Sequence, residues 1–212
     1  MTLLWLVRHG ETDWNRARRI QGATDVPLND TGRAQARRAG ELLRRRTVDA
    51  VVASPLVRAA ETGAIVAEVL GLAAPALVPE LAERRYGVAE GLTPAEVEAR
   101  FPAGTRVPGR ESRTALLDRV LPALDEIARA HAGGSVVVAT HGAVVRAIVT
   151  AVATGADAGV GVPIRNGSVH SFEVAADGLR LRRFDDPLED ESELSGGDAL
   201  AAQNALEGSR PE

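Results

Sequence analysis

The chain has 212 residues, of which 45% are hydrophobic, which is enough for one large domain with a full core or for two small ones. It contains no cysteine, which excludes disulfides, thiolate nucleophiles and every zinc site that needs sulfur ligands. All 25 basic residues are arginine, which also excludes a phosphate-loop lysine, a Schiff-base lysine and the lysine of a protein kinase. The candidate chemical groups are therefore four histidines, the carboxylates, the hydroxyls and the arginines.

The formal net charge of −4 is unevenly distributed. Residues 185–212 carry nine acidic side chains and one arginine, a net charge of −8, whereas residues 1–184 carry a net charge of +4. Because the tail has few large apolar residues, burial cannot offset the entropy of ordering it. We therefore expect one domain over 1–184 and a flexible acidic tail over 185–212, which is either an inert solubilising segment or a weak competitor at an anion site.

Several classes of partner are disfavoured by the sequence. No stretch of 18 apolar residues is free of charge, and the apolar run at 3–7 is too short for a signal peptide, so we expect a cytoplasmic protein with no membrane contact. Six aromatic residues among scattered arginines argue against a nucleic-acid surface. The sequence does not identify the oligomeric state, and a homodimer is left open.

The first half of the chain alternates short apolar runs with amphipathic segments. The run at 3–7 predicts a buried strand that stops at Arg8-His9-Gly10. The capping sequence Asn29-Asp30-Thr31-Gly32 opens a stretch to Arg46 with apolar residues on one face, which predicts an amphipathic helix. Next we expect a strand at 49–53, a helix from Pro55 to about Leu70 and a loop over 71–93.

The second half continues the alternation. We expect helices at 94–101 and 112–131, a strand at 135–140, a helix at 143–154, and a hairpin of strands 168–174 and 179–184. Strands that alternate with helices of ten or more residues predict an α/β fold, a three-layer sandwich with a mostly parallel central sheet.

One local pattern is predicted to occur twice: a strand, then His-Gly, then a helix. It is found at Arg8-His9-Gly10 and at Thr140-His141-Gly142. In an open α/β sheet, ligands bind beyond the carboxyl ends of the strands, so both histidines face one crevice if their strands are neighbours. Glycine after each histidine would let a ligand approach the backbone closely.

Arginine and histidine at such a crevice suit phosphoryl transfer. Arg8, at a strand end, and Arg58, in the first turn of a helix, can bind a phosphate bidentately. Two arginines and a protonated histidine could stabilise the transferring group without a metal, while a second, neutral histidine attacks phosphorus. A further acid must then protonate the leaving oxygen.

Five motifs in order resemble the histidine phosphatase superfamily, which has the phosphoglycerate mutase-like fold. They span residues 3 to about 174 and comprise Leu6 to Asn15, Gln21 to Leu28, Ser54 to Ala59, Leu81 to Gly87, and Thr140-His141-Gly142. The resemblance implies His9 as nucleophile, Glu83 as proton donor, and three phosphate clamps, namely Arg8, Arg58 and His141. It also implies that Asn15, Gln21 and Gly22 lie near the phosphoryl group or substrate.

The resemblance leaves three functions to weigh. Glu83 to Gly87 is similar to the family's mutases, but Pro94 stands where they carry a lysine, and only Arg100 to Glu111 replaces their long insertion. We therefore expect the phosphatase branch: a metal-independent, histidine acid phosphatase-type phosphomonoesterase that needs no cofactor and acts on a small phosphorylated metabolite through a phosphohistidine. A cofactor-dependent phosphoglycerate mutase and a non-catalytic phosphate-binding or regulatory module are the alternatives.

Other chemical groups have structural interpretations. We expect His131 to cap a helix end and His170 to lie on the surface of the sheet. Glu80 competes with Glu83 for the acid role, and the motif favours Glu83.

Overall fold

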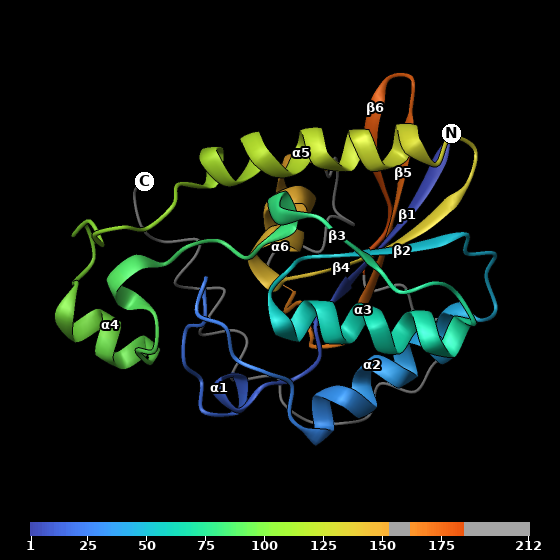
Figure 1. Cartoon of the computed structure of the whole chain (residues 1–212). Coiled ribbons are helices and arrows are strands. Elements are labelled where there is room, and N and C mark those ends of the chain that lie inside the picture. The colour runs from blue at the N-terminus through green and yellow to red at the C-terminus, as the bar shows by residue number, and fades with distance from the viewer. Residues whose placement is uncertain (153–161, 185–212) are drawn as a thin grey trace.

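The computed structural model describes residues 1–152 and 162–184, and a six-stranded sheet runs through its centre (Figure 1). The strand order is β3-β2-β4-β1-β5-β6. The strands are β1 (Thr2–Arg8), β2 (Ala50–Ala53), β3 (Ala76–Leu77), β4 (Ser135–Thr140), β5 (Val169–Ala175) and β6 (Gly178–Arg183). β3, β2, β4 and β1 pair in parallel, while β5 and β6 form the antiparallel hairpin predicted from the sequence.

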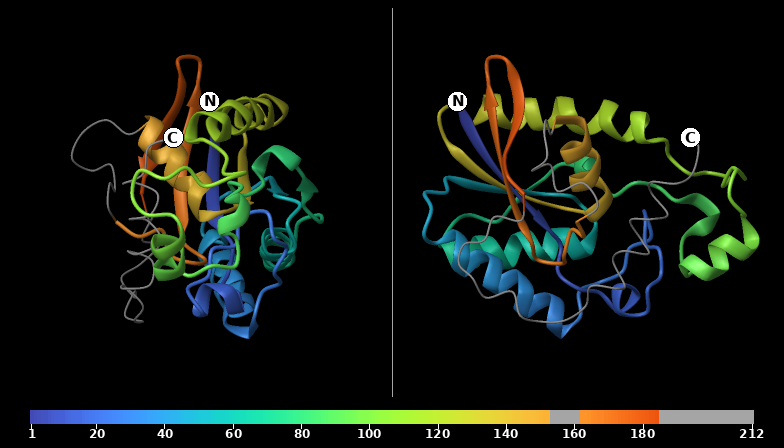
Figure 2. Two further views of the ribbon diagram at one scale, coloured as in Figure 1. Left: turned by 90° about the vertical axis from the view of Figure 1, so that its left-hand side faces the viewer. Right: turned by 180° about the vertical axis from the view of Figure 1, so that it is seen from behind.

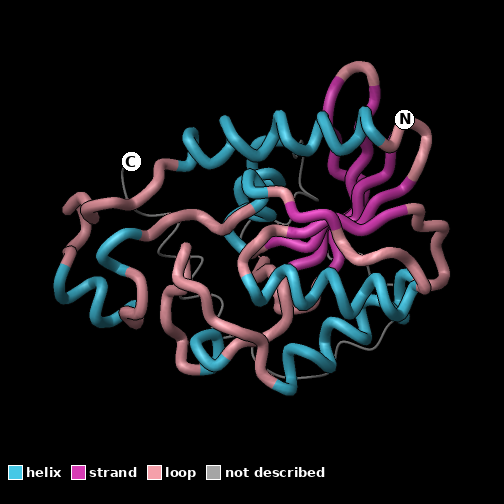
Figure 3. The backbone as a smooth tube through the Cα atoms, in the orientation of Figure 1, coloured by secondary structure: helices cyan, strands magenta, loops and turns pink. Residues whose placement is uncertain are grey.

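Helices cover both faces of this sheet, as the ribbon views show (Figures 2 and 3). They are α1 (Asp13–Arg16), α2 (Asp30–Leu43), α3 (Val57–Leu70), α4 (Pro94–Arg100), α5 (Arg113–Ala130) and α6 (Gly142–Val152). α2 and α3 lie together on one face, and α5 and α6 on the other. The predicted three-layer α/β sandwich with a mostly parallel sheet is confirmed.

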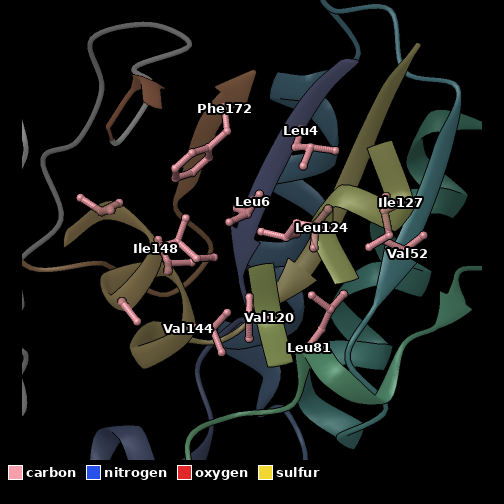
Figure 4. Close-up of a cluster of buried hydrophobic side chains, with 14 of the residues drawn as sticks. Leu4, Leu6, Val52, Leu81, Val120, Leu124, Ile127, Val144, Ile148 and Phe172 are labelled. Carbon is pink, nitrogen blue, oxygen red and sulfur yellow. The ribbon is translucent and has the colours of Figure 1, made fainter. Parts of the chain in front are cut away.

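The sequence of β1 explains why the sheet is covered on both sides. Successive side chains of a strand point to opposite faces. Leu4 and Leu6 join the core against α5 and α6 (Figure 4), whereas Trp5 and Val7 join the core against α2 and α3. All four are buried, so the strand is a continuous apolar run rather than an alternation of apolar and polar residues.

N-cap residues form hydrogen bonds at the starts of three of the predicted helices. Asn29 accepts a hydrogen bond from the Gly32 amide at 2.9 Å and begins α2, and Ser112 accepts one from Ala115 at 3.0 Å and begins α5. Thr93 forms a reciprocal capping box with Glu96 ahead of α4. These hydrogen bonds satisfy amide groups that the first helical turn leaves without partners.

The stretch 71–93 is not the plain loop that the sequence predicted. It contains β3, the 3-10 helix η1 (Pro79–Leu81) and a second 3-10 helix, η2 (Gly87–Ala89). β3 pairs with β2 through only two residues, Ala76 and Leu77, both exposed, so the strand is too short for a pattern of buried positions to mark it. α1 was missed for a similar reason, because it has four residues and buries none of them.

Two sequence predictions fall outside the described residues: the end of the helix expected at 143–154, and the acidic tail at 185–212. Within residues 1–152 and 162–184, no helix is both long and apolar enough to cross a membrane.

Candidate active site

The two histidines of the repeated pattern lie side by side because β1 and β4 are neighbouring parallel strands. Arg8 and Thr140 are partners in the strand register, and the His9 amide donates to the Thr140 carbonyl at 2.9 Å. The ring centroids of His9 and His141 are 5.3 Å apart. The condition stated from the sequence, that the two strands are neighbours, is therefore met.

His9 is buried, and its environment keeps the ring neutral with a defined tautomer. Nδ1 lies 2.7 Å from the Gly10 carbonyl oxygen, which can only accept, so Nδ1 carries the proton and Nε2 keeps its lone pair. Burial, and after it the positive charges of Arg58 and Arg8, lower the pKa of His9 well below its ordinary value. A neutral imidazole with a free Nε2 lone pair is the form that can act as a nucleophile.

Arg58 is fully buried in the first turn of α3 and organises the loop that precedes Asp25. Its guanidinium donates to the Gly22 carbonyl at 2.8 Å and to the Thr24 carbonyl at 3.0 Å. Burial lowers its pKa from the ordinary value, although nearby carboxylates, Glu83 first among them, oppose this. Its Nε has no hydrogen-bond partner within the described part of the chain.

His141 lies beside this guanidinium and is equally buried. Its Nε2 is 2.7 Å from Ser54 Oγ, and its Nδ1 has no partner among residues 1–152 and 162–184. Burial, and then the charge of Arg58, lower the pKa of His141 well below its usual range. A protonated histidine is one option in the scheme drawn from the sequence, but burial, and then the neighbouring positive charges, favour the neutral ring of His141 in the ligand-free protein.

The glycines after the two histidines allow other parts of the protein to pack closely against the backbone. A Cβ on Gly10 would lie 2.1 Å from the Gly32 carbonyl oxygen, so this glycine lets the first turn of α2 approach β1. A Cβ on Gly142 would lie 3.2 Å from Nε of Arg8, whose guanidinium also donates to the Ile164 carbonyl. Packing of α2 and placement of Arg8 are thus structural reasons for these glycines, and close approach of a ligand stays a prediction.

The structure separates the two candidate acids. Glu83 is 8% exposed; its carboxylate accepts from the Arg84 amide at 2.9 Å and from the Ala143 amide at 3.4 Å. Glu83 also interacts electrostatically with Arg58, which places it at the site. Glu80 is exposed to solvent. The geometry therefore favours Glu83, as the motif did.

The three residues expected near the substrate lie around the same site. The Asn166 amide group bridges Asn15, through its Oδ1 at 3.3 Å, and the carbonyl of His9 at 2.9 Å. Gly22 has a φ of +58°, and its carbonyl is held by Arg58; Gln21 precedes it and is buried. Asn15, Gln21 and Gly22 are thus connected to the histidine pair through the protein.

Several residues that support this site were missed by sequence reasoning. Thr62 accepts from the Gly10 amide at 3.1 Å and donates to the Arg58 carbonyl at 2.7 Å. Glu90 accepts from the Thr24 amide at 2.9 Å and from the Tyr86 amide at 3.0 Å. Ser54 and Asn166 belong to the same group. Each is a single polar residue with at least one partner far away in the sequence, so only its position after an apolar run, as for Ser54, could have indicated it.

The remaining histidines are not part of the histidine pair. His131 is the C-terminal cap of α5, as predicted. His170 is fully buried, which corrects the prediction of a surface position. It lies opposite Leu6 in the strand register, on the face that α6 covers, with its ring 4.7 Å from that of Phe184. Burial, and then the charges of Arg146 and Arg8, lower its pKa to about 3.

The comparisons with known proteins agree with this geometry. The family model of the histidine phosphatase superfamily (branch 1) matches residues 4–187. The chain belongs to this superfamily. The chain is 36% identical over 184 residues to the uncharacterized phosphatase PhoE of Bacillus subtilis, and the alignment covers 87% of this chain and 94% of PhoE.

Two further superfamily members have more specific names. A metal-independent phosphoserine phosphatase of Arabidopsis thaliana is 38% identical over 171 residues, covering 75% of this chain and 72% of the relative. The structure of a mycobacterial glucosyl-3-phosphoglycerate phosphatase complexed with VO3 superposes with a TM-score of 0.75 at 30% identity, covering 86% of this chain and 98% of that one. Other relatives carry the name probable phosphoglycerate mutase.

Proposed function

We propose that this superfamily member is a phosphomonoesterase that transfers the phosphoryl group of a small phosphorylated metabolite first to His9 and then to water. The observation that carries the proposal is the geometry at His9: the ring is buried, and Nδ1 lies 2.7 Å from the Gly10 carbonyl oxygen, so Nδ1 carries the proton and Nε2 is left to attack phosphorus. Burial and the charges of Arg58 and Arg8 lower its pKa, which also favours the neutral ring. Binding alone requires neither a nucleophile nor an acid, so this arrangement argues against a purely regulatory module.

The first chemical step follows from the positions of these groups. The Nε2 lone pair of His9 attacks phosphorus, the N–P bond forms and the P–O bond to the leaving group breaks. Arg8, Arg58 and the Nδ1 side of His141 face the equatorial oxygens and stabilise their charge. Glu83, in its protonated form, gives its proton to the leaving oxygen.

The second step reverses the role of Glu83. As a carboxylate it takes a proton from water, whose oxygen attacks phosphorus while the N–P bond breaks. The products are inorganic phosphate and a neutral His9, and Glu83 is protonated again. In this scheme the Gly10 carbonyl holds the Nδ1 proton throughout both steps, so the ring never has to change tautomer.

The proposal includes metal independence of the histidine acid phosphatase type. Two arginines supply positive charge that a metal would otherwise provide, and one relative is itself named metal-independent. Among the described residues, no group of three or more His, Asp or Glu side chains could hold a metal ion. The proposal also includes three predictions made from the sequence: a cytoplasmic location, a domain over 1–184 followed by an acidic tail, and a possible homodimer.

A cofactor-dependent phosphoglycerate mutase is the second candidate. It is favoured by the motif from Glu83 to Gly87 and by relatives named as mutases. It is disfavoured by Pro94 in place of a lysine and by the short segment between Arg100 and Glu111.

A panel of phosphorylated metabolites and p-nitrophenyl phosphate, assayed in excess chelator with and without bisphosphoglycerate, tests the proposal. We expect release of inorganic phosphate in chelator, and loss of several orders of magnitude in rate for His9→Ala. Phosphoryl exchange between phosphoglycerates that depends on bisphosphoglycerate, without phosphate release, would identify a mutase. Activity that disappears in chelator and returns with a divalent ion would overturn metal independence.

A further inference from the structure

Arg119 fastens helix α5 to the segment that carries Glu83. Its guanidinium donates to the carbonyl oxygens of Glu80 at 2.5 Å, Ala82 at 2.9 Å and Glu83 at 3.1 Å. In Figure 1, η1 lies directly beneath α5, where these contacts are made. The Arg119 side chain therefore binds three of the four backbone carbonyl groups in residues 80–83, the segment that ends at Glu83, the proposed acid.

Glu111 completes this connection from the other side. Its carboxylate accepts two hydrogen bonds from Arg119, at 2.9 Å and 3.0 Å, and one from the Arg85 amide at 3.2 Å. The backbone of Glu111 forms two further hydrogen bonds. Its amide donates to the Arg85 carbonyl at 2.9 Å, and its carbonyl accepts from Nε of Arg84 at 2.7 Å. The backbone is thus held on both sides of Glu83.

The environment of the Glu111–Arg119 ion pair favours the charged form of Glu111. The side chain of Glu111 is 3% exposed and that of Arg119 is 25% exposed. Burial raises the pKa of Glu111, but the hydrogen bonds from Arg119 and from the Arg85 amide outweigh it, so the pKa lies below the ordinary value. Because the two charges neutralise each other, the pair can hold the backbone without adding a net charge next to the acid.

The position of the Glu83 carboxylate depends on that backbone. Its carboxylate accepts a hydrogen bond from the adjacent Arg84 amide at 2.9 Å and one from the Ala143 amide at 3.4 Å, and the first of these donors belongs to the held segment. A general acid must lie within hydrogen-bond reach of the leaving oxygen, and a displacement of about 1 Å at such a position can cost about 100-fold in rate.

We propose that Arg119 and Glu111 are positioning residues, which hold the backbone of residues 80–85 so that Glu83 can protonate the leaving group. This inference rests on the proposed function. The competing interpretation is that the pair only stabilises the fold, in which case its loss would lower every activity in proportion to the amount of folded enzyme.

The leaving group distinguishes these interpretations. p-Nitrophenolate departs without a proton, whereas the alkoxide of phosphoserine needs one. We expect Arg119→Met to lower kcat/KM about 10- to 100-fold for phosphoserine or a similar alkyl phosphate, and less than about 3-fold for p-nitrophenyl phosphate. Arg129→Met is the matched control, since Arg129 is on the same helix in an exposed ion pair with Asp125, and it should change neither value.

Three additional variants make the result decisive. Arg119→Lys keeps a cation that can reach the carbonyls but cannot form the two-bond contact to Glu111, so it should restore part of the alkyl phosphate activity. Glu111→Gln tests the pair from the other side, and should show the same selectivity even if Arg119→Met fails to fold. Glu83→Gln, assayed on both substrates, sets the pattern that the positioning variants must reproduce.

Equal losses on both substrates for Arg119→Met and Glu111→Gln, beside a selective loss for Glu83→Gln, would overturn the positioning role and leave the proposed function intact. Equal losses for Glu83→Gln itself would instead remove Glu83 from the acid role, and the inference would fail with it. The amount of phosphate bound covalently per chain gives the fraction of enzyme that has an active site. Dividing each rate by this fraction corrects for unfolded enzyme.

Discussion

Replacing His170 should make the stability of this protein less sensitive to acid. The ring is fully buried and its pKa is lowered to about 3, mainly by burial, from an ordinary value of 6.5. Below pH 6.5 the unfolded chain therefore binds a proton at this position that the folded chain does not bind. Stability rises with pH wherever the unfolded state binds more protons, so this residue destabilises the fold progressively between pH 6.5 and about pH 3.

The size of the effect follows from the two pKa values. At pH 5 the unfolded histidine is almost fully protonated and the folded one is not, which costs about 2 kcal/mol relative to pH 7.5. His9 and His141 add to the acid sensitivity in the same direction, since their pKa values are also lowered, but they are present in both proteins. Glu111 has a lowered pKa, so its contribution is lost only below about pH 4.5 and is constant over this window.

Urea unfolding of the wild type and of His170→Gln at pH 7.5 and pH 5 measures the difference. The glutamine variant should be less stable at pH 7.5, because it loses the ring contact with Phe184, but it should lose about 2 kcal/mol less than the wild type on acidification. Val169→Ala, a buried neighbour without a titrating group, should lower stability equally at both pH values. If His170→Gln and the wild type lose the same stability on acidification, the buried neutral state of His170 is refuted.

Four further predictions concern activity. Glu83→Gln should slow hydrolysis of alkyl phosphates far more than that of p-nitrophenyl phosphate, whereas equal losses would move the acid role elsewhere, with Glu80 the next candidate. Arg58→Met removes a buried cation and its two carbonyl contacts, and should lower kcat/KM about 100- to 1000-fold, measured with p-nitrophenyl phosphate; a change below about 10-fold would exclude it as a phosphate clamp. Dialysis against a chelator should leave kcat unchanged, and a metal-dependent recovery would contradict the account. Truncation after Phe184 should lower KM modestly at low ionic strength if the acidic tail competes with substrate, with the difference fading near 0.15 M salt, where screening acts beyond ~8 Å; an unchanged KM in low salt would make the tail inert.

The fold was predictable because its elements carry strong local signals. The apolar runs at β1, β2 and β4 fit strands covered on both faces, and caps such as Asn29 and Ser112 mark helix starts through hydrogen bonds to nearby residues. β3 has two residues, both exposed, and α1 has a capping box at Thr12 but only four residues and no buried side chain, so neither is long enough to show an apolar periodicity. Elements of that kind depend on the neighbouring structure rather than on their own sequence.

The site was predictable where a residue follows a strand or lies in a motif, and not where it acts through space. His9 and His141 follow neighbouring strands, so the topology alone brings them together. The protonation state of His141 has no local signal, because it depends first on burial and then on arginines from other segments. Asn166 and Arg119 were missed because each contacts backbone groups more than 30 residues away, which no local pattern records.

The measurement that tests the central claim most directly is the location of phosphate on the enzyme during turnover. The enzyme would be mixed with a fast substrate such as p-nitrophenyl phosphate, quenched in base within milliseconds, and mapped by mass spectrometry. The account predicts acid-labile, base-stable phosphate on His9, present in the wild type and absent from His9→Ala. Phosphate on another residue, or full turnover by His9→Ala, would contradict it.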